Sequence, residues 1–179
     1  MGVGRRRSRW RAASIAAVIV VVALGAGLAA FAFVFVPFVL PNLQTSVAET
    51  DRTESVRDAG TAVTVVVPAG WSVQRESEDA PRVVVRTPDA KLSITVDVAD
   101  ADLATAASTA GIEGLGPLHR ETVTTGAPLV HAQAAEALVA AIGGERASGR
   151  FVVRVTEDVS LEEYRAEIAG LLDTVRVES

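Results

Sequence analysis

A long uncharged apolar run near the start of this sequence constrains its structure more than any other feature. The run extends from Ala12 to Leu40 and contains no charged residue. At a rise of about 1.5 Å per residue, a helix over residues 15–36 covers the roughly 30 Å hydrocarbon core of a bilayer. We therefore predict a single transmembrane helix within residues 12–40. Its anchoring side chains are expected to be Ile15, Val20, Leu24, Leu28, Phe31 and Phe35.

The charges on the two sides of this run differ in sign. The residues before it include five arginines: Arg5, Arg6, Arg7, Arg9 and Arg11. The first charges after it are the acidic Glu49 and Asp51. Because the basic flank of a membrane helix stays in the cytoplasm, we predict a cytoplasmic tail in residues 1–11. The rest of the chain is then extracytoplasmic, and the protein belongs in the plasma membrane.

Two further interpretations of the apolar run remain open. A cleaved signal peptide has an apolar region of about 7 to 15 residues before a site of small residues. The run is longer, which favours an uncleaved signal anchor, although Ser46-Val47-Ala48 would allow cleavage. In addition, Gly25 and Ala29 have the small-xxx-small spacing that lets membrane helices associate, so the helix would then also assemble a membrane complex.

The exported part is more acidic than the whole chain. The 179 residues carry 17 Lys and Arg and 22 Asp and Glu, for a net charge of -5; without the five N-terminal arginines, 12 basic residues face 22 acidic ones, or -10. From its total charge, such a domain is expected to avoid nucleic acid and anionic headgroups, so we exclude nucleic acid as a partner. There is no cysteine, which excludes disulfides and a lipidated cysteine. The bias towards Arg, Ala and Val is typical of high-GC bacteria such as actinobacteria.

The remainder of the chain divides into a polar stretch and a patterned region. Residues 41–60 lack a sustained apolar period, so we expect a flexible linker there. Residues 61–179 suffice for one core, and we predict a single α+β domain. In residues 91–98 apolar and polar side chains alternate, which indicates a strand with one buried face. Further strands are expected at 61–67, 71–75, 82–86, 119–125, 129–134, 136–142 and 150–156, although the composition of 136–142 also suits a helix.

Two helices are expected to pack on this mostly antiparallel sheet. Asp100 or Asp102 can cap a short helix that ends near Gly111. Ser160 and Glu163 form a capping box before a longer amphipathic helix. The structural core is expected to include Trp71, Ile94, Val96, Phe151, Val153, Tyr164, Ile168, Leu171 and Leu172.

Three segments carry a resemblance to a known superfamily. They are Val65-Val66-Val67-Pro68-Ala69-Gly70-Trp71, Arg86-Thr87-Pro88-Asp89 with the strand that follows, and the ending Leu171-Leu172-Asp173-Thr174-Val175-Arg176-Val177. With the order of expected elements, they make the chain similar to the Mog1/PsbP-like α/β/α sandwich superfamily. The resemblance implies a binding or scaffolding role. It carries over no functional residue.

The remaining sequence features do not define a catalytic, cofactor or metal site. His119 and His131 are the two histidines, and zinc would need further ligands at positions that the sequence does not indicate. A hydrolase would lack the Gly-x-Ser-x-Gly elbow. We therefore expect a non-enzymatic accessory or binding protein of the bacterial envelope without a cofactor, whose partners are the bilayer and another envelope or membrane protein, with a small ligand left open. The alternative is a metal-independent envelope hydrolase with His131 or His119 as its base.

Overall fold

The computed structural model describes residues 45–144 and 147–178. The predicted cytoplasmic tail, the transmembrane anchor in 12–40 and the Gly25 and Ala29 pair lie outside the described residues and stay predictions. Among the described residues, no helix has both the length and the hydropathy that a membrane crossing requires. The described residues form one compact unit.

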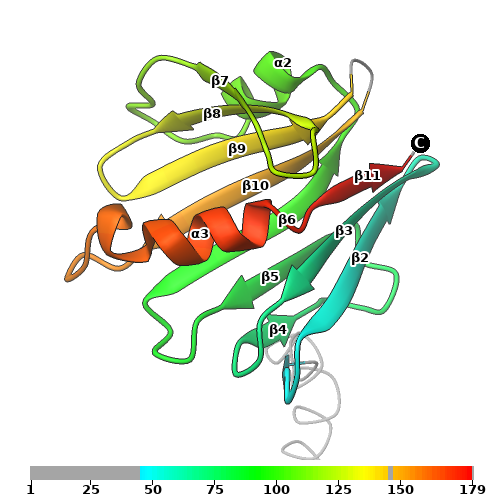
Figure 1. Ribbon diagram of the computed structural model, residues 1–179, viewed down its shortest axis with the longest axis vertical. Coiled ribbons are helices and arrows are strands. Elements are labelled where there is room, and N and C mark those ends of the chain that lie inside the picture. The colour runs from blue at the N-terminus through cyan, green and yellow to red at the C-terminus, as the bar shows by residue number, and fades with distance from the viewer. Residues whose placement is uncertain (1–44, 145–146, 179) are drawn as a thin grey trace, which may run out of the picture. The chain divides into compact units, whose positions relative to one another are not determined.

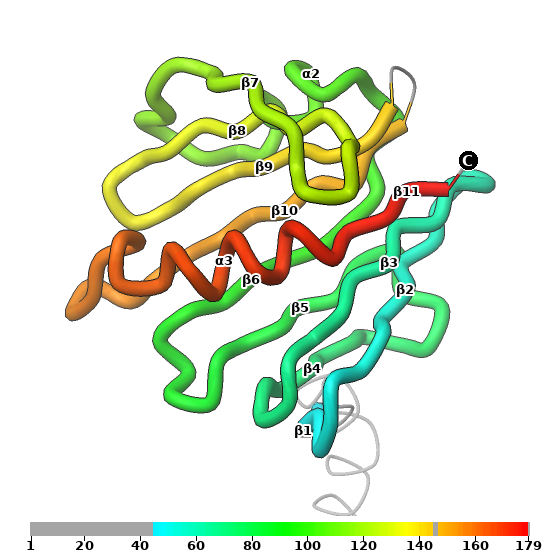
Figure 2. The backbone as a smooth tube through the Cα atoms, in the orientation of Figure 1, coloured from blue at the N-terminus to red at the C-terminus, as the bar shows by residue number. Residues whose placement is uncertain are grey.

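Two antiparallel sheets build this unit (Figures 1 and 2). The larger sheet has eight described strands in the order β1 (Thr45–Val47), β4 (Ser72–Gln74), β5 (Arg82–Arg86), β6 (Leu92–Ala99), β10 (Ser148–Val155), β9 (Ala137–Gly143), β8 (Pro128–Gln133) and β7 (His119–Thr122). The smaller sheet has three, in the order β11 (Arg176–Glu178), β3 (Thr61–Val67) and β2 (Arg52–Asp58). The helical elements are α2 (Leu103–Ser108), the 3-10 turn η1 (Leu161–Tyr164) and α3 (Arg165–Leu172).

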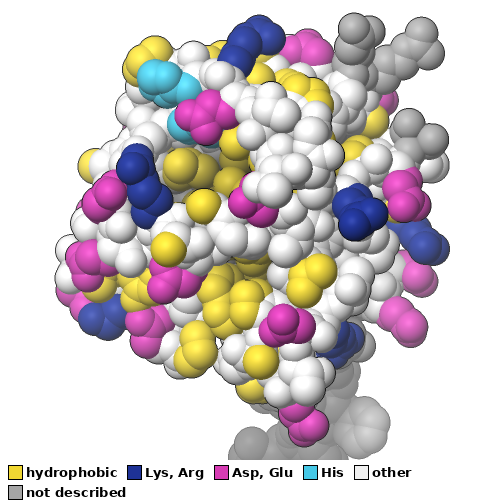
Figure 3. All heavy atoms as spheres, in the orientation of Figure 1, with side chains coloured by type: hydrophobic (Ala, Val, Ile, Leu, Met, Phe, Trp, Pro, Cys, Tyr) yellow, Lys and Arg dark blue, Asp and Glu magenta, His cyan; other side chains and the backbone are white. Residues whose placement is uncertain are grey.

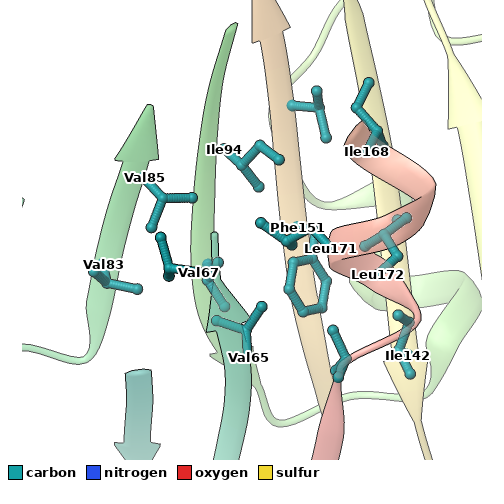
Figure 4. Close-up of a cluster of buried hydrophobic side chains, with 14 of the residues drawn as sticks. Val65, Val67, Val83, Val85, Ile94, Ile142, Phe151, Ile168, Leu171 and Leu172 are labelled. Carbon is teal, nitrogen blue, oxygen red and sulfur yellow. The ribbon is translucent and has the colours of Figure 1, made fainter. Parts of the chain in front are cut away.

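The larger sheet is the middle layer. In β9, Ala140 and Ile142 join the main core, whereas Val139 and Ala141 join a second, smaller core. This division follows from the two-residue period of a strand. The main core lies under α3 and the smaller sheet, as the close-up in Figure 4 shows. The second core lies under α2, which packs on β8, β9 and β10.

The two sheets lie close together at Gly149 of β10. A Cβ atom built on this glycine would lie 2.8 Å from Cγ1 of Val63 in β3 and 3.2 Å from the ring of Phe151. Both neighbours are fully buried. Glycine is therefore required here by the packing of one sheet on the other, because any side chain would displace buried atoms.

The expected flexible linker is wrong for residues 45–58, which form β1 and β2. The segment looks polar because its strands have exposed faces, yet Val56 is fully buried in the main core. The carboxylate of Glu54 is also buried, with its two oxygens 2.7 Å from Nε of Arg52 and 2.7 Å from Nη2 of Arg75. One ion pair within β2 and one long-range ion pair to Arg75 thus replace the apolar pattern that would have revealed the strand.

Most other expected elements are found. The strands expected at 61–67 and 82–86 coincide with β3 and β5, and the ambiguous segment 136–142 is the strand β9. Asp102, rather than Asp100, caps α2 by accepting from the amides of Ala104 and Thr105. β11 was not expected; it pairs with β3 and begins immediately after buried Val175.

The nine residues expected in the core differ in burial. Eight are buried: Trp71, Ile94, Val96, Phe151, Val153, Ile168, Leu171 and Leu172. Tyr164 is only partly buried and packs against the edge of the same core. Its hydroxyl explains this position, because it donates a hydrogen bond to the exposed carboxylate of Asp89.

Candidate functional site

A groove lies between the helix α3 and the β7, β8 and β9 end of the larger sheet. Its volume is about 390 Å³, which is within the range of small-ligand sites. On the face that Figure 3 shows, hydrophobic atoms lie beside the histidines and between the charged side chains. The groove is open to solvent, so an extended segment can enter it from the side.

The floor of the groove is apolar and comes from elements distant in sequence. Leu129 and Leu138 belong to neighbouring strands, and both side chains face the main core. Leu161, Ile168 and Leu172 approach them from η1 and α3, where they are at most 7% exposed. Because the helix covers this end of the sheet only in part, solvent reaches the apolar lining mainly at Leu138, which is partly exposed, and at Ala169, which is exposed.

The rim of the groove is polar and mainly acidic. Its charged side chains are Glu121, His131, Glu162, Arg165 and Asp173, and the amide of Gln133 lies among them. Glu162 and Arg165 form an exposed ion pair at 3.3 Å. Three carboxylates against one guanidinium give the rim a net negative charge while the histidine is neutral. An apolar segment flanked by basic side chains therefore complements both floor and rim.

The two histidines meet at this rim. β7 pairs with β8 so that His119 lies directly opposite His131, and their rings stack with centroids 5.4 Å apart. Nε2 of His131 is 3.4 Å from a carboxylate oxygen of Glu121. The strand register places all three side chains on one face, because they lie at alternate or directly paired positions.

Two hydrogen bonds hold the C-terminal end of α3 over the groove. Oδ1 of Asp173 accepts from the backbone amide of Thr124 at 2.9 Å, which lowers the pKa of this carboxyl below its usual value of 3.8. The hydroxyl of Thr174 accepts from the amide of Val66 in β3 at 3.0 Å and donates to the carbonyl of Leu171 at 2.7 Å. The helix is thereby fixed to the β7–β8 turn and to the smaller sheet.

A cluster of hydrogen bonds around Asp89 fixes the other, N-terminal end of the η1–α3 segment. The carboxylate of Asp89, in the turn after β5, accepts from the hydroxyls of Thr87 and Tyr164 and from the amide of Lys91. The hydrogen bond from Thr87 contributes most, and together they lower the pKa of Asp89 to about 2. The same contact raises the pKa of Tyr164 to about 12. Both ends of the η1–α3 segment are therefore tied to the sheet, and the groove is preformed.

The arrangement is suited to binding more than to chemistry. Nucleophilic catalysis needs a hydroxyl or thiol within hydrogen-bonding reach of its base, and within residues 45–144 and 147–178 no hydrogen bond joins a hydroxyl to either histidine. In the same part of the chain, no cluster of three or more His, Cys, Asp or Glu side chains is placed to hold a metal ion. What the groove offers is an apolar surface with charged hydrogen-bonding groups around it.

The sequence indicated some members of this site and missed others. It singled out His119 and His131 as the two histidines but gave no sign of the stacking between them. It placed Ile168, Leu171 and Leu172 in the structural core, and Ile168 and Leu172 also line the groove. Glu121, Gln133 and Asp173 carried no recognisable signal, because their proximity depends on how α3 crosses the sheet.

Comparisons with known proteins give weak similarities only. No protein-family model matches the chain, and no curated protein matches it. The solution structure of cyanobacterial PsbP (CyanoP) from Synechocystis sp. PCC 6803 is similar with 12% identity and a TM-score of 0.46, covering 74% of this chain and 95% of that chain. A crystal structure of a protein from Bacteroides thetaiotaomicron VPI-5482 gives 10% identity and a TM-score of 0.38, over 65% of this chain and 45% of that chain.

Proposed function

We propose that the chain is a single-pass, membrane-anchored accessory protein of a bacterial envelope of the actinobacterial type, and that its extracytoplasmic domain binds another envelope protein through the α3 groove without catalysis. The uncharged run Ala12 to Leu40 behind five arginines supports the anchor and its orientation. The groove supports the binding role.

The observation that carries the proposal is the combination of an apolar floor with an acidic rim on a preformed surface. Ile168 and Leu172 line the floor, and Glu121, Glu162 and Asp173 stand at its edge. A partner segment with apolar side chains and flanking Lys or Arg would bury the floor and pair with the rim. Because α3 is already tied to the sheet at both ends, little ordering of the domain would oppose binding.

Site-specific photocrosslinking in intact cells tests this binding role. A photoreactive residue replaces Ala169, an exposed residue of α3 that lines the groove. The matched control places it at Val152, a partly exposed residue on the opposite face of the larger sheet. We expect a discrete crosslinked membrane protein from position 169 that is absent from position 152. Equal products from both positions would contradict a binding site in the groove.

A charge variant then tests the chemistry of the partner. Glu162→Lys inverts a rim charge that is 72% exposed in its side chain and has no role in the core. We expect it to weaken the crosslink from position 169, whereas Glu157→Lys, an exposed acidic residue outside the groove, leaves the crosslink unchanged. Loss of the crosslink in both variants would indicate a response to the total charge of the domain. It would contradict the proposal that the acidic rim pairs with basic side chains of the partner.

One observation favours the alternative of an envelope hydrolase. His131 faces the groove with Glu121 3.4 Å from its Nε2, and a carboxylate beside an imidazole is the arrangement that a general base uses. The double variant His119→Gln, His131→Gln separates the two functions. A hydrolase that depends on either imidazole loses its cellular phenotype while the crosslink from position 169 persists, whereas in a binding protein the phenotype follows the crosslink.

A further inference from the structure

The far face of the larger sheet carries a regular array of arginines. The outward residues of β5, β6 and β10 form three rows across the strands. The first row is Arg82, Asp97 and Arg150; the second is Val84, Thr95 and Val152; the third is Arg86, Ser93 and Arg154. We call these nine residues the arginine face. With neighbouring strands about 4.8 Å apart and residues about 3.4 Å apart along a strand, the four arginines mark the corners of a rectangle of about 10 by 14 Å.

No described element packs over this array. The helix α2 covers β8, β9 and one end of β10, and its core residues do not include any member of the arginine face. Within residues 45–144 and 147–178, Arg82, Arg86 and Arg154 are exposed and the other six residues are partly exposed. The face is therefore an open part of the sheet surface.

The charges of the arginine face are only partly neutralised. Arg150 binds Asp97 through two hydrogen bonds of 2.9 and 2.8 Å, and Arg82 pairs with Glu76 at 3.1 Å. Arg86 and Arg154 make no ion pair within the described part of the chain, so two guanidinium groups remain free on the third row. Four arginines against the two carboxylates of Asp97 and Glu76 leave a local charge of +2 on a domain whose overall charge is negative.

The opposite side of the domain has the reverse charge. The η1–α3 segment presents Glu162, Glu163 and Glu167 with Arg165 as its one basic residue. The larger sheet therefore separates an acidic surface, which contains the groove, from a basic one. A negatively charged plane would orient this domain by attracting the arginine face and repelling the α3 side.

We propose that the arginine face docks on the anionic lipid headgroups of the bilayer that anchors the chain. This inference rests on the proposed anchor. Only residues 41–44 separate the apolar run from β1, and five residue steps reach about 17 Å at most, so the domain is held at the bilayer surface. Tethering supplies an effective concentration of the order of mM, so a weak electrostatic contact is sufficient.

Docking in this way would leave the groove free. The arginine face and the groove lie on opposite faces of the larger sheet, because Leu129 and Leu138 join the main core and the arginines point away from it. With the arginines on the headgroups, the acidic rim would face away from the membrane. The lipid contact would thus present the proposed binding site to an envelope partner instead of competing with it.

The test measures how close the face lies to the headgroups in the full-length protein. The chain has no cysteine, so Ser72→Cys introduces one labelling site beside Arg86, its partner across the strands. Ala166→Cys labels the exposed side of α3 as a control. Each labelled protein is reconstituted in phosphatidylcholine vesicles, with or without phosphatidylglycerol, and quenching by a headgroup-attached quencher is recorded.

We expect phosphatidylglycerol to increase quenching at position 72 but not at position 166, and high salt to reverse the increase. Arg86→Gln with Arg154→Gln should lower the ratio of docked to undocked protein about 30-fold, since each basic residue near an anionic surface contributes about fivefold. Arg165→Gln, on the α3 side, should have no such effect. A thermal melt verifies that the variants fold.

The docking proposal would be overturned if quenching at position 72 did not depend on the lipid charge, or if it persisted in the variant with both Arg86→Gln and Arg154→Gln. Quenching that changes only when an acidic polypeptide is added would also overturn it and assign the face to a protein partner. Alkaline extraction of the same vesicles distinguishes the two proposals. Release of the protein from the vesicles would contradict the proposed membrane anchor. A protein that stays in the vesicles but shows no charge-dependent quenching would contradict only the proposed lipid contact.

Discussion

The two faces of the larger sheet use the same strands for different purposes. In β10, Phe151 and Val153 are buried under α3 and the smaller sheet, while Arg150, Val152 and Arg154 between them form part of the open arginine face. Every second residue of one strand therefore contributes to the core and the others to a surface. The comparison shows that the total charge of a domain says little about a given face, because strand alternation sorts charges by position.

The largest difference in the free energy of unfolding is expected between alanine variants of two neighbouring residues of β10. Phe151→Ala removes a fully buried ring from the main core and should lower the free energy of unfolding by about 3 to 5 kcal/mol. Val152→Ala, one residue along and on the open face, should change it by less than about 1 kcal/mol. Urea unfolding of both variants measures the difference. Similar losses would mean that the far face is covered after all.

Alanine substitutions at two glycines are expected to change the stability of the fold in opposite directions. Gly149→Ala places a methyl group 2.8 Å from Val63 and should destabilise the fold by about 1 to 3 kcal/mol. Gly170→Ala fills open space in α3 and should stabilise it by about 0.5 to 1 kcal/mol. Thermal unfolding reports both. A neutral Gly149→Ala variant would show that the two sheets are not in close contact at β10 and β3.

A smaller contrast is expected within the arginine face. Arg150→Gln breaks the paired hydrogen bonds to Asp97 across β10 and β6 and should cost about 0.5 to 1 kcal/mol. Arg154→Gln removes an exposed charge without an ion pair in the described residues, and stability should not change measurably. Chemical denaturation in low salt makes the comparison. Equal losses would place a partner on Arg154 that the described chain does not show.

The smallest effect is the pH dependence of the contact between Asp89 and Tyr164. The pKa of Asp89 is lowered from 3.8 to about 2, so its stabilisation is present above the unfolded value and lost as the pH falls from about 4 through 2. The pKa of Tyr164 is raised from 10.0 to about 12, so its stabilisation is present below pH 10 and lost as the pH rises through 12.

Melting temperatures across pH check this contact. Tyr164→Phe removes the donated hydrogen bond, and its difference from the unsubstituted protein should disappear at both pH extremes. Because the Tyr164→Phe variant has no phenol to ionise, it should also lack the fall in melting temperature above pH 10 that this contact causes. A difference that stays constant from acid to alkaline pH would contradict the hydrogen bond and assign the effect of the variant to packing alone.

The sequence predicted those strands and helix caps that depend on residues close together in the chain. Alternation identified β6, because Leu92, Ile94 and Val96 stand every second residue. The segment 45–58 was misread because an ion pair to Arg75, twenty-one residues away, buries Glu54 in a strand that looks polar. Local periodicity contains no information about such partners.

The candidate site was harder to predict than the fold. Its residues come from β7, β8, β9 and α3, and only the crossing of the helix brings Glu121 and Asp173 to one rim. The arginine face was hidden for a similar reason. Arg86 and Arg154 are 68 positions apart, and they share a face only because both pair with Ser93. Sheet order, rather than local composition, creates both surfaces.

Hydroxyl-radical footprinting of the full-length protein in vesicles would compare the two faces in one experiment. Oxidation of Val84 and Val152 reports on the arginine face, and oxidation of Leu138 reports on the groove. Replacing phosphatidylcholine with phosphatidylglycerol should protect both valines and leave Leu138 unchanged. Equal protection at all three residues, or protection at Leu138 alone, would contradict a sheet whose basic face meets the bilayer while its acidic groove stays open.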